Sequence, residues 1–122
     1  MTPIKLLVVD DHPLMREAIR TTVAEEADLL VIGEAADGLE GLKLARDLQP
    51  DVIIMDLLMP GMDGLEAIAR IRAVDPQVKI LVVTSLNNEE RVLAAIQAGA
   101  LGYFPKTSSR AITSPAGTAD TM

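Results

Sequence analysis

Three short, continuous apolar runs constrain the fold of this chain most strongly. They span residues 4–9, 52–55 and 80–83, and they are rich in Val, Ile and Leu. Such runs are typical of strands that are buried on both faces, as in a parallel sheet covered by helices. Residues 30–35 and 101–104 are weaker strand candidates, so the sequence predicts five strands.

Apolar residues at helical spacing lie between these runs and predict four helices. Their stripes are Leu14, Met15, Ala18, Ile19, Thr22 and Val23; Leu39, Leu42, Ala45 and Leu48; Leu65, Ile68 and Ile71; and Val92, Ala95 and Ile96. Strands that alternate with helices in this way predict a doubly wound α/β fold, which is a parallel sheet with helices on both faces.

The predicted helices have recognisable ends. Pro13 suits the first turn of the first helix, where its missing N–H costs nothing. Three pairs with the spacing of a capping box mark the other starts, namely Asp37 with Glu40, Asp63 with Glu66, and Asn87 with Glu90. The stops that follow the later helices are Pro50, Pro76 and Gly99.

Composition narrows the class of protein. The chain has 122 residues, enough for one domain with a hydrophobic core. Its net charge of −7 argues against direct binding to nucleic acid or to anionic membranes. It has no cysteine, no signal-peptide pattern and no apolar run near the roughly 20 residues of a transmembrane helix. We therefore expect a cytoplasmic protein that does not contact DNA or membranes through this chain.

Polar residues follow four of the predicted strands. Asp10 and Asp11 follow the first strand, Asp56 the third, Thr84 the fourth and Lys106 the fifth. Open parallel sheets bind ligands at the edge where the carboxyl ends of the strands meet. Three close carboxylates need more counter-charge than one lysine supplies, and Mg²⁺ accepts carboxylates, waters and phosphate oxygens. The pattern predicts a Mg²⁺ site in which one carboxylate attacks phosphorus.

Three of these residues also have a simpler explanation when each is taken alone, whereas Asp56 is harder to explain as a helix cap because no helix is expected before about Gly64. Asp11 could cap the helix that begins at Pro13. Thr84 is a common strand residue, and Lys106 could be a surface lysine. His12 is the only histidine, and without an evident partner set it is interpreted as a loop residue rather than a metal ligand. The five polar positions together are more specific than any one of them.

The motifs resemble those of the receiver domain of bacterial two-component response regulators. The resemblance spans residues 4–107 and rests on "VVDDHPLMREAI", "DVIIMDLLMPGMDGLEAI", "ILVVTS" and "AGALGYFPK". The stretches "DDHPL" and "GEAADG" are most similar to the NarL/FixJ-like subfamily. The resemblance implies a flavodoxin-like sheet with strand order 2-1-3-4-5.

The resemblance also implies roles for individual residues. Asp56 is the expected phosphoacceptor, which takes its phosphoryl group from a phosphohistidine on a sensor histidine kinase. Asp11, Asp56 and the backbone carbonyl of Leu58 are the expected Mg²⁺ ligands, with Asp10 acting through a water. The expected contacts of the phosphoryl oxygens are Thr84 and Lys106, and the switch pair is Thr84 and Tyr103.

The chain departs from the family pattern in its last residues. We expect a receiver domain over residues 1–107 and a tail or linker over 108–122, with one short helical turn at most. Ile112 is the only large aliphatic residue between Lys106 and Met122, so the last helix is predicted to be missing or rudimentary. The uncovered sheet face would then be an interface for a homodimer or for another chain. A truncation artefact is the alternative.

A second departure concerns the lifetime of the phosphorylated state. Leu58 and Leu86 each lie two residues after a site residue, Asp56 and Thr84 respectively. Neither leucine can orient a hydrolytic water, so we expect slow self-dephosphorylation. The alternative is that Leu58 simply packs within its loop.

Function is predicted as a phosphorylation-controlled switch of a protein-interaction surface, in transcription regulation by family inference. It turns over no external substrate. Two alternatives stay open: a constitutive interaction module that is not phosphorylated, and a Mg²⁺-dependent phosphatase with an aspartyl nucleophile. The phosphatase is disfavoured because such enzymes place a D-x-D motif after the first strand, whereas Asp10 and Asp11 are adjacent.

Overall fold

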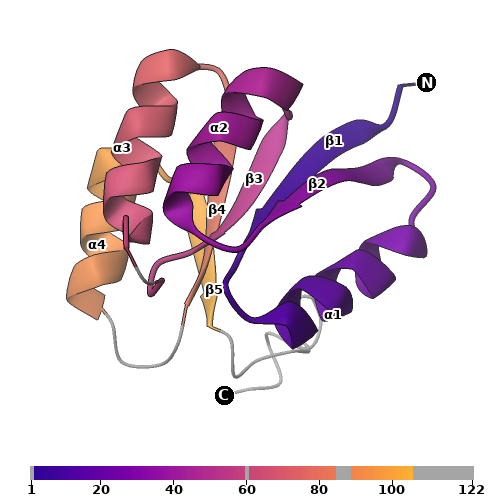
Figure 1. Cartoon of the computed structure of the whole chain (residues 1–122), viewed down its shortest axis with the longest axis horizontal. Helices are drawn as coiled ribbons and strands as arrows, with labels where there is room; N and C mark the ends of the chain where they lie inside the picture. The colour runs from indigo at the N-terminus through magenta and orange to yellow at the C-terminus, as the bar shows by residue number, and fades with distance from the viewer. Residues whose placement is uncertain (1, 60, 85–88, 106–122) are drawn as a thin grey trace.

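A computed structural model describes residues 2–59, 61–84 and 89–105, which form a parallel sheet flanked by helices (Figure 1). The elements in chain order are β1 (Ile4–Val9), α1 (Pro13–Ala24), β2 (Leu29–Ala35), α2 (Gly38–Leu48), β3 (Val52–Asp56), α3 (Gly64–Val74), β4 (Lys79–Thr84), α4 (Glu89–Ala98) and β5 (Gly102–Pro105). All the predicted strands and helices are confirmed. Asp56 and Thr84, expected just beyond their strands, are the last residues of β3 and β4.

The strand order is β2-β1-β3-β4-β5, as the resemblance implies. β1 lies between β2 and β3, and it pairs parallel with both. Because the chain moves from β1 outward to β2 and then back across to β3, the direction of winding reverses between β1 and β3. The carboxyl ends of these two strands therefore flank the switch point, which is where doubly wound sheets bind their ligands.

The helices divide unequally between the two faces of the sheet. Among the described residues, α2, α3 and α4 pack on one face, and α1 alone packs on the other (Figure 1). Successive side chains of β1 alternate between these layers, since strand residues point to opposite faces. Leu7 and Val9 join the larger cluster, whereas Leu6 and Val8 pack with Ile19 of α1.

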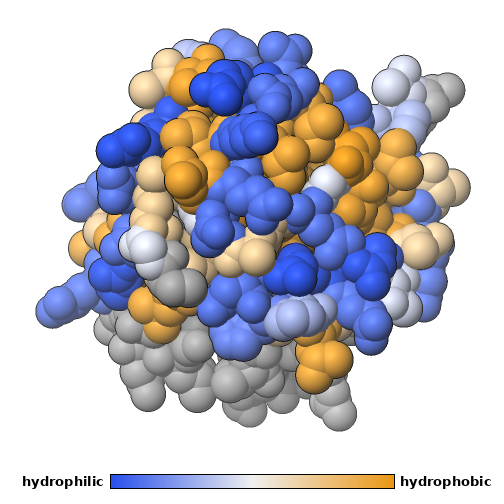
Figure 2. All heavy atoms as spheres, in the orientation of Figure 1, coloured by the Kyte–Doolittle hydropathy of each residue, from blue (hydrophilic) through white to orange (hydrophobic). Residues whose placement is uncertain are grey.

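A groove remains beside α1 on the less covered face. It has a volume of about 540 Å³, and its lining includes Leu6, Ile54, Leu81, Val83 and Phe104. The predictions about the last helix and the tail concern residues 106–122, which lie outside the described residues. Ile4 and Leu30, near the amino ends of β1 and β2, are also exposed. Hydrophobic residues reach the surface at several places on the face shown in Figure 2.

The helix caps agree with the sequence only in part. Asp37 accepts a hydrogen bond from the Glu40 N–H at 2.8 Å, and the Glu40 carboxylate accepts from the Ala36 N–H rather than from Asp37 itself. Asp63 accepts from the Glu66 N–H at 3.0 Å. The Glu66 side chain, however, pairs with the guanidinium of the next helical turn and does not complete a capping box. The predicted cap at residue 87 lies outside the described residues.

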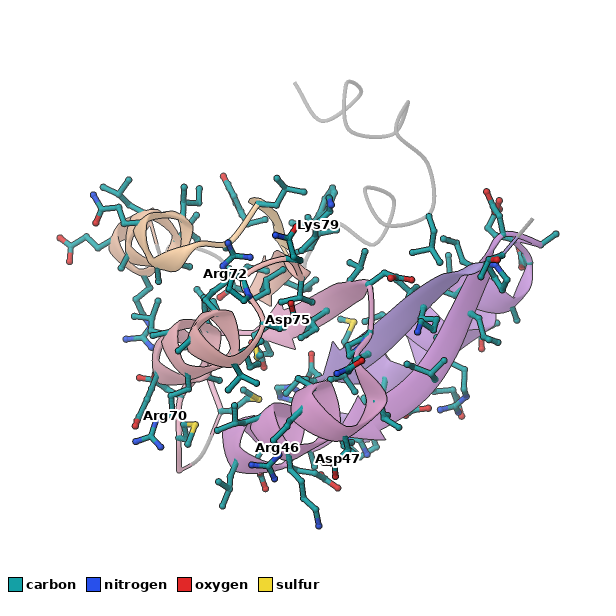
Figure 3. The ribbon with its side chains drawn as sticks, turned by 90° about the horizontal axis from the view of Figure 1, so that it is seen from above. Arg46, Asp47, Arg70, Arg72, Asp75 and Lys79 are labelled. Carbon is teal, nitrogen blue, oxygen red and sulfur yellow. The ribbon has the colours of Figure 1, made fainter. Side chains whose placement is uncertain are left out.

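The amino ends of the strands carry charges of both signs. Figure 3 shows this end of the molecule, where Arg72, Asp75 and Lys79 lie near the start of β4. Among the described residues, the cluster of potential metal ligands lies instead at the opposite, carboxyl end of the sheet. In the part of the chain that the structure describes, no helix is both long enough and apolar enough to span a membrane.

Candidate metal centre

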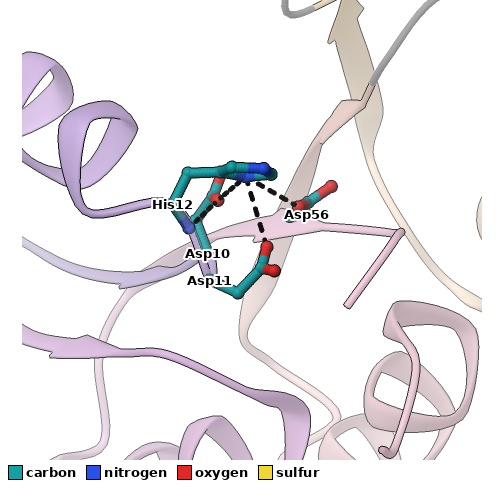
Figure 4. A group of neighbouring side chains, drawn as sticks. All are labelled: Asp10, Asp11, His12 and Asp56. Carbon is teal, nitrogen blue, oxygen red and sulfur yellow. Dashed lines mark hydrogen bonds and ion pairs between the residues drawn. The ribbon is translucent and has the colours of Figure 1, made fainter. Parts of the chain in front are cut away.

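Four potential ligands converge where β1 and β3 end. One ligand atom from each of Asp10, Asp11, His12 and Asp56 lies within 4.8 Å of the others (Figure 4). The register explains the convergence, because Val9 pairs with Met55 and the next residue of each strand is an aspartate. Asp10 and Asp56 are each only 2 % exposed. The structure thus brings together the three carboxylates that the sequence predicted to meet.

Asp10 is held by hydrogen bonds from three directions. Its N–H donates to the Ala35 carbonyl at 2.9 Å, which extends the pairing of β1 with β2. Its carbonyl accepts from the Arg16 guanidinium at 2.6 Å, and its Oδ1 accepts from the His12 N–H at 2.9 Å. Arg16 also pairs with Glu34 of β2. Sequence reasoning missed Arg16, although an arginine in the first turn of a helix can reach back to the preceding strand end.

His12 lies in the loop between β1 and α1, as interpreted, but it contacts all three carboxylates, so the view that it has no partner set was wrong. Its Nδ1 lies 3.0 Å from Asp10 Oδ1, 3.2 Å from Asp11 Oδ1 and 3.9 Å from Asp56 Oδ2 (Figure 4). It is the N-cap residue of α1 but makes no side-chain capping bond. Asp11 is therefore not the cap of α1, and that simpler explanation of Asp11 is also wrong. Adjacency to the acidic pair was the available signal for His12.

The loop after β3 fixes the orientation of Asp56. The Leu58 N–H donates to Asp56 Oδ1 at 3.1 Å, and the Gly64 N–H donates to the Leu57 carbonyl at 3.0 Å. Leu58 itself is 40 % exposed, which argues against the simple packing role considered for it. The loop thus holds one oxygen of Asp56 and ties the phosphoacceptor candidate to the start of α3.

The start of α3 is further tied to α4. The Asp63 carboxylate accepts from the Glu66 N–H and lies 3.1 Å from the Arg91 guanidinium. The Glu66 hydrogen bond chiefly, and Arg91 in addition, hold the pKa of Asp63 below its usual value of 3.8, against a smaller opposing effect of burial. The carboxylate therefore stays ionised and links the two helices.

Buried polar atoms at this edge fit a bound ligand. Thr84 is 2 % exposed, and its hydroxyl has no hydrogen-bond partner among the described residues. Thr84 follows Val83, which pairs with Asp56 in the sheet. Burying a hydroxyl without a partner is costly, so such an atom at the carboxyl end of the sheet points to a partner beyond the described residues, as a bound ligand would provide.

The three carboxylates of this cluster fit a hard divalent cation. Carboxylate oxygens, a backbone carbonyl and waters are the ligands that Mg²⁺ prefers. Of the other predicted site residues, Tyr103 lies on β5 and is 49 % exposed. Lys106 and Leu86 fall outside the described residues.

Comparison with known proteins identifies the family of this chain. The family described as the response regulator receiver domain matches residues 6–113. The chain belongs to this family. Over 108 residues, the receiver domain is 46 % identical to the transcriptional regulatory protein LiaR of Bacillus subtilis. The aligned segment covers 88 % of this chain and 51 % of LiaR. It spans about half the length of the curated relatives that it matches.

Solved structures confirm the receiver fold. The receiver domain of the NarL regulator from Mycobacterium tuberculosis is 32 % identical, with a TM-score of 0.85 over 99 % of this chain and 97 % of that one. The isolated receiver domain of RcsB from Salmonella enterica, solved with the phosphomimetic BeF₃⁻, is 27 % identical, with a TM-score of 0.83 over 97 % of this chain and 87 % of that one. Receiver domains are signalling switches in two-component systems and do not turn over external substrates.

Proposed function

We propose that this receiver domain accepts a phosphoryl group on Asp56 from a phosphohistidine of a sensor histidine kinase. The supporting observation is the convergence of Asp10, Asp11 and Asp56 within 4.8 Å at the carboxyl edge of the sheet. Three carboxylates this close together, two of them buried, need a counter-charge to stay ionised. A site of this kind suits phosphoryl transfer, in which catalysis consists mainly of positioning and charge neutralisation.

In the proposed reaction, a carboxylate oxygen of Asp56 attacks the phosphorus atom. An O–P bond forms, the N–P bond of the phosphohistidine breaks, and its electron pair returns to the imidazole nitrogen. Asp11, Asp56 and the Leu58 carbonyl would hold Mg²⁺, with Asp10 acting through a water. Such an ion would supply positive charge to balance the negative charge on the phosphoryl oxygens. The hydroxyl of Thr84 donates to one of these oxygens, and Lys106 contacts another.

The proposed switch connects Thr84 to Tyr103. Thr84 is the last residue of β4, and Val82 of the same strand pairs with Tyr103 on β5. When the Thr84 hydroxyl binds a phosphoryl oxygen, its side chain moves toward Asp56 and leaves room that the Tyr103 ring can enter. The surface around α4 and β5 then differs between the two states, and only such a state-dependent contact shifts partner affinity.

For the protein that carries this domain, we propose a role in transcription regulation. LiaR is named a transcriptional regulatory protein, and the NarL of Escherichia coli is named a nitrate/nitrite response regulator. The receiver itself is acidic, with a net charge of −7, so contacts with DNA would come from a separate domain.

Intact-protein mass spectrometry tests the phosphoacceptor. The chain is incubated with a small phosphodonor such as acetyl phosphate, with Mg²⁺ or with a chelator. We expect a mass gain of one phosphoryl group with Mg²⁺, its absence in Asp56→Asn, and an unchanged gain in Asp47→Asn, which removes an exposed carboxylate of α2. A gain that persists in Asp56→Asn, or no gain in the wild type, would contradict the proposal. Continuous phosphate release from small esters would instead indicate a phosphatase.

A further inference from the structure

We propose that His12 Nδ1 is a direct ligand of the cation, so that the centre is a mixed carboxylate and imidazole site. This inference rests on the metal site of the proposed function and adds a ligand to it. The expected consequence is a preference for cations that bind imidazole, such as Ni²⁺ and Zn²⁺, beyond the preference of a site made of oxygen ligands alone.

The distances from Nδ1 to the two proposed carboxylate ligands fall within the range found between ligands of one ion. With metal–ligand bonds of about 2.1 Å in an octahedron, adjacent ligand atoms are about 3.0 Å apart and opposite ones about 4.2 Å apart. Nδ1 is 3.2 Å from Asp11 Oδ1 and 3.9 Å from Asp56 Oδ2, the two proposed carboxylate ligands, whereas its 3.0 Å contact with Asp10 Oδ1 is a hydrogen bond. An ion held by Asp11 and Asp56 therefore has the imidazole nitrogen within reach.

The backbone around His12 is fixed before any ligand arrives. Its N–H donates to Asp10 Oδ1, and its carbonyl accepts from the N–H groups of Met15 and Arg16, both at 3.1 Å. These bonds set the residue as the N-cap of α1, with φ −96° and ψ 110°. A ligand on a fixed backbone loses little conformational entropy on binding, so the imidazole contributes more to affinity than a mobile side chain would.

To bind a metal, the imidazole must present a lone pair at Nδ1, with its proton on Nε2. In its contact with Asp10, Nδ1 can carry a proton, which it gives up when the ion binds. The His12 side chain is 60 % exposed, so solvent water can exchange the proton from Nδ1 to Nε2. The contact at 3.2 Å with Asp11 Oδ1 is not a hydrogen bond, so no such bond holds that oxygen away from an ion.

Thr84 is an observation independent of the acidic group. Its hydroxyl is buried without a partner among the described residues, next to the strand that ends in Asp56. A ligand bound at the carboxyl edge, either the ion with its waters or an anion on the ion, supplies what this hydroxyl lacks. At the opposite end of the sheet, where positive and negative side chains mix, the described residues form no comparable cluster of potential metal ligands (Figure 3).

The test compares two metals on the whole chain, prepared without an affinity tag. Binding of Mg²⁺ alone and of Ni²⁺ alone is measured by titration calorimetry for the wild type, His12→Ala and Leu14→Ala. Leu14 is the matched control, because it is two residues away, 79 % exposed and outside the ligand group. We expect His12→Ala to weaken Ni²⁺ binding about tenfold and Mg²⁺ binding about twofold at most, and Leu14→Ala to change neither.

Two further measurements locate the bound ion. Since His12 is the only histidine, its ring nitrogens give one set of ¹⁵N signals, and we expect the Nδ1 signal to shift on saturation with Zn²⁺. We also expect Asp11→Asn to weaken Ni²⁺ binding. An unshifted Nδ1 signal, Ni²⁺ binding that survives Asp11→Asn, or an unchanged ratio of Ni²⁺ to Mg²⁺ affinity in His12→Ala would each overturn the inference. If the wild type bound neither cation, the metal site of the proposed function would fail as well.

Discussion

Replacing Gly64 with alanine tests how tightly α3 is packed against β3, the strand that ends in the proposed phosphoacceptor Asp56. A Cβ at this position would lie 2.5 Å from the Asp56 carbonyl oxygen and 2.6 Å from Leu57 Cα. Real Cβ atoms essentially never approach other atoms closer than 3.0 Å, so backbone would have to move by about half an ångström. The atoms in the way belong to the residue that we propose is phosphorylated and to its neighbour.

The expected cost follows from two opposing effects. Overpacking of a tight site destabilises a protein by about 1–3 kcal/mol, and the upper part of this range applies because the clash is with backbone. Replacing glycine in a helix returns at most about 1 kcal/mol. We therefore expect Gly64→Ala to lose about 2 kcal/mol of stability, which corresponds to a decrease in Tm of roughly 10 °C for a domain of this size.

Urea unfolding followed by circular dichroism measures the loss, and intact mass after reaction with acetyl phosphate measures the effect on Asp56. Gly102→Ala is the matched control, because a Cβ there meets only Leu81 Cδ2 at an ordinary 3.9 Å. We expect the control to change stability by less than about 1 kcal/mol and to react at the wild-type rate. If Gly64→Ala were as stable and as reactive as the control, the packing argument would be refuted.

Three further predictions concern the cap, the loop and the groove. Asp63→Ala should cost about 1 kcal/mol at neutral pH in urea unfolding. Because folding lowers the pKa of Asp63, its contribution to the free energy of unfolding is complete above pH 3.8 and is lost as the pH falls through the lower folded pKa. A difference in stability between variant and wild type that stayed constant down to acid pH would contradict this. Leu58→Asn should speed loss of the acyl phosphate by about tenfold, and an unchanged half-life in a mass time course would remove the basis for slow dephosphorylation. We expect the chain to dimerise through the apolar groove beside α1. Phe104 lines this groove, so Phe104→Glu should give a monomer by light scattering. Leu101 is exposed outside the lining, so Leu101→Glu should leave the dimer intact. A wild-type monomer at micromolar concentration would count against a dimer.

The central strands were predictable because burial on both faces requires continuous apolar runs, as in residues 4–9. The weaker candidates, β2 and β5, are the edge strands of the sheet, where partial exposure relaxes that requirement. The caps at Asp37 and Asp63 were predictable for a similar reason, since the spacing of three residues is a local property. Where a side chain had a choice of partners, as Glu66 does, local spacing did not decide between them.

By itself, the sequence determined the order of strands and helices, because burial patterns and helix caps depend on residues close together in the chain. It also placed acidic residues directly at the ends of β1 and β3. Only the tertiary structure decided that Nδ1 of His12 lies beside Asp56, 44 residues later, and that Arg16 reaches the carbonyl of Asp10. These contacts depend on the pairing register of β1 with β3 and on the path by which the chain enters α1. Both are set by packing across the whole sheet, which no local pattern encodes.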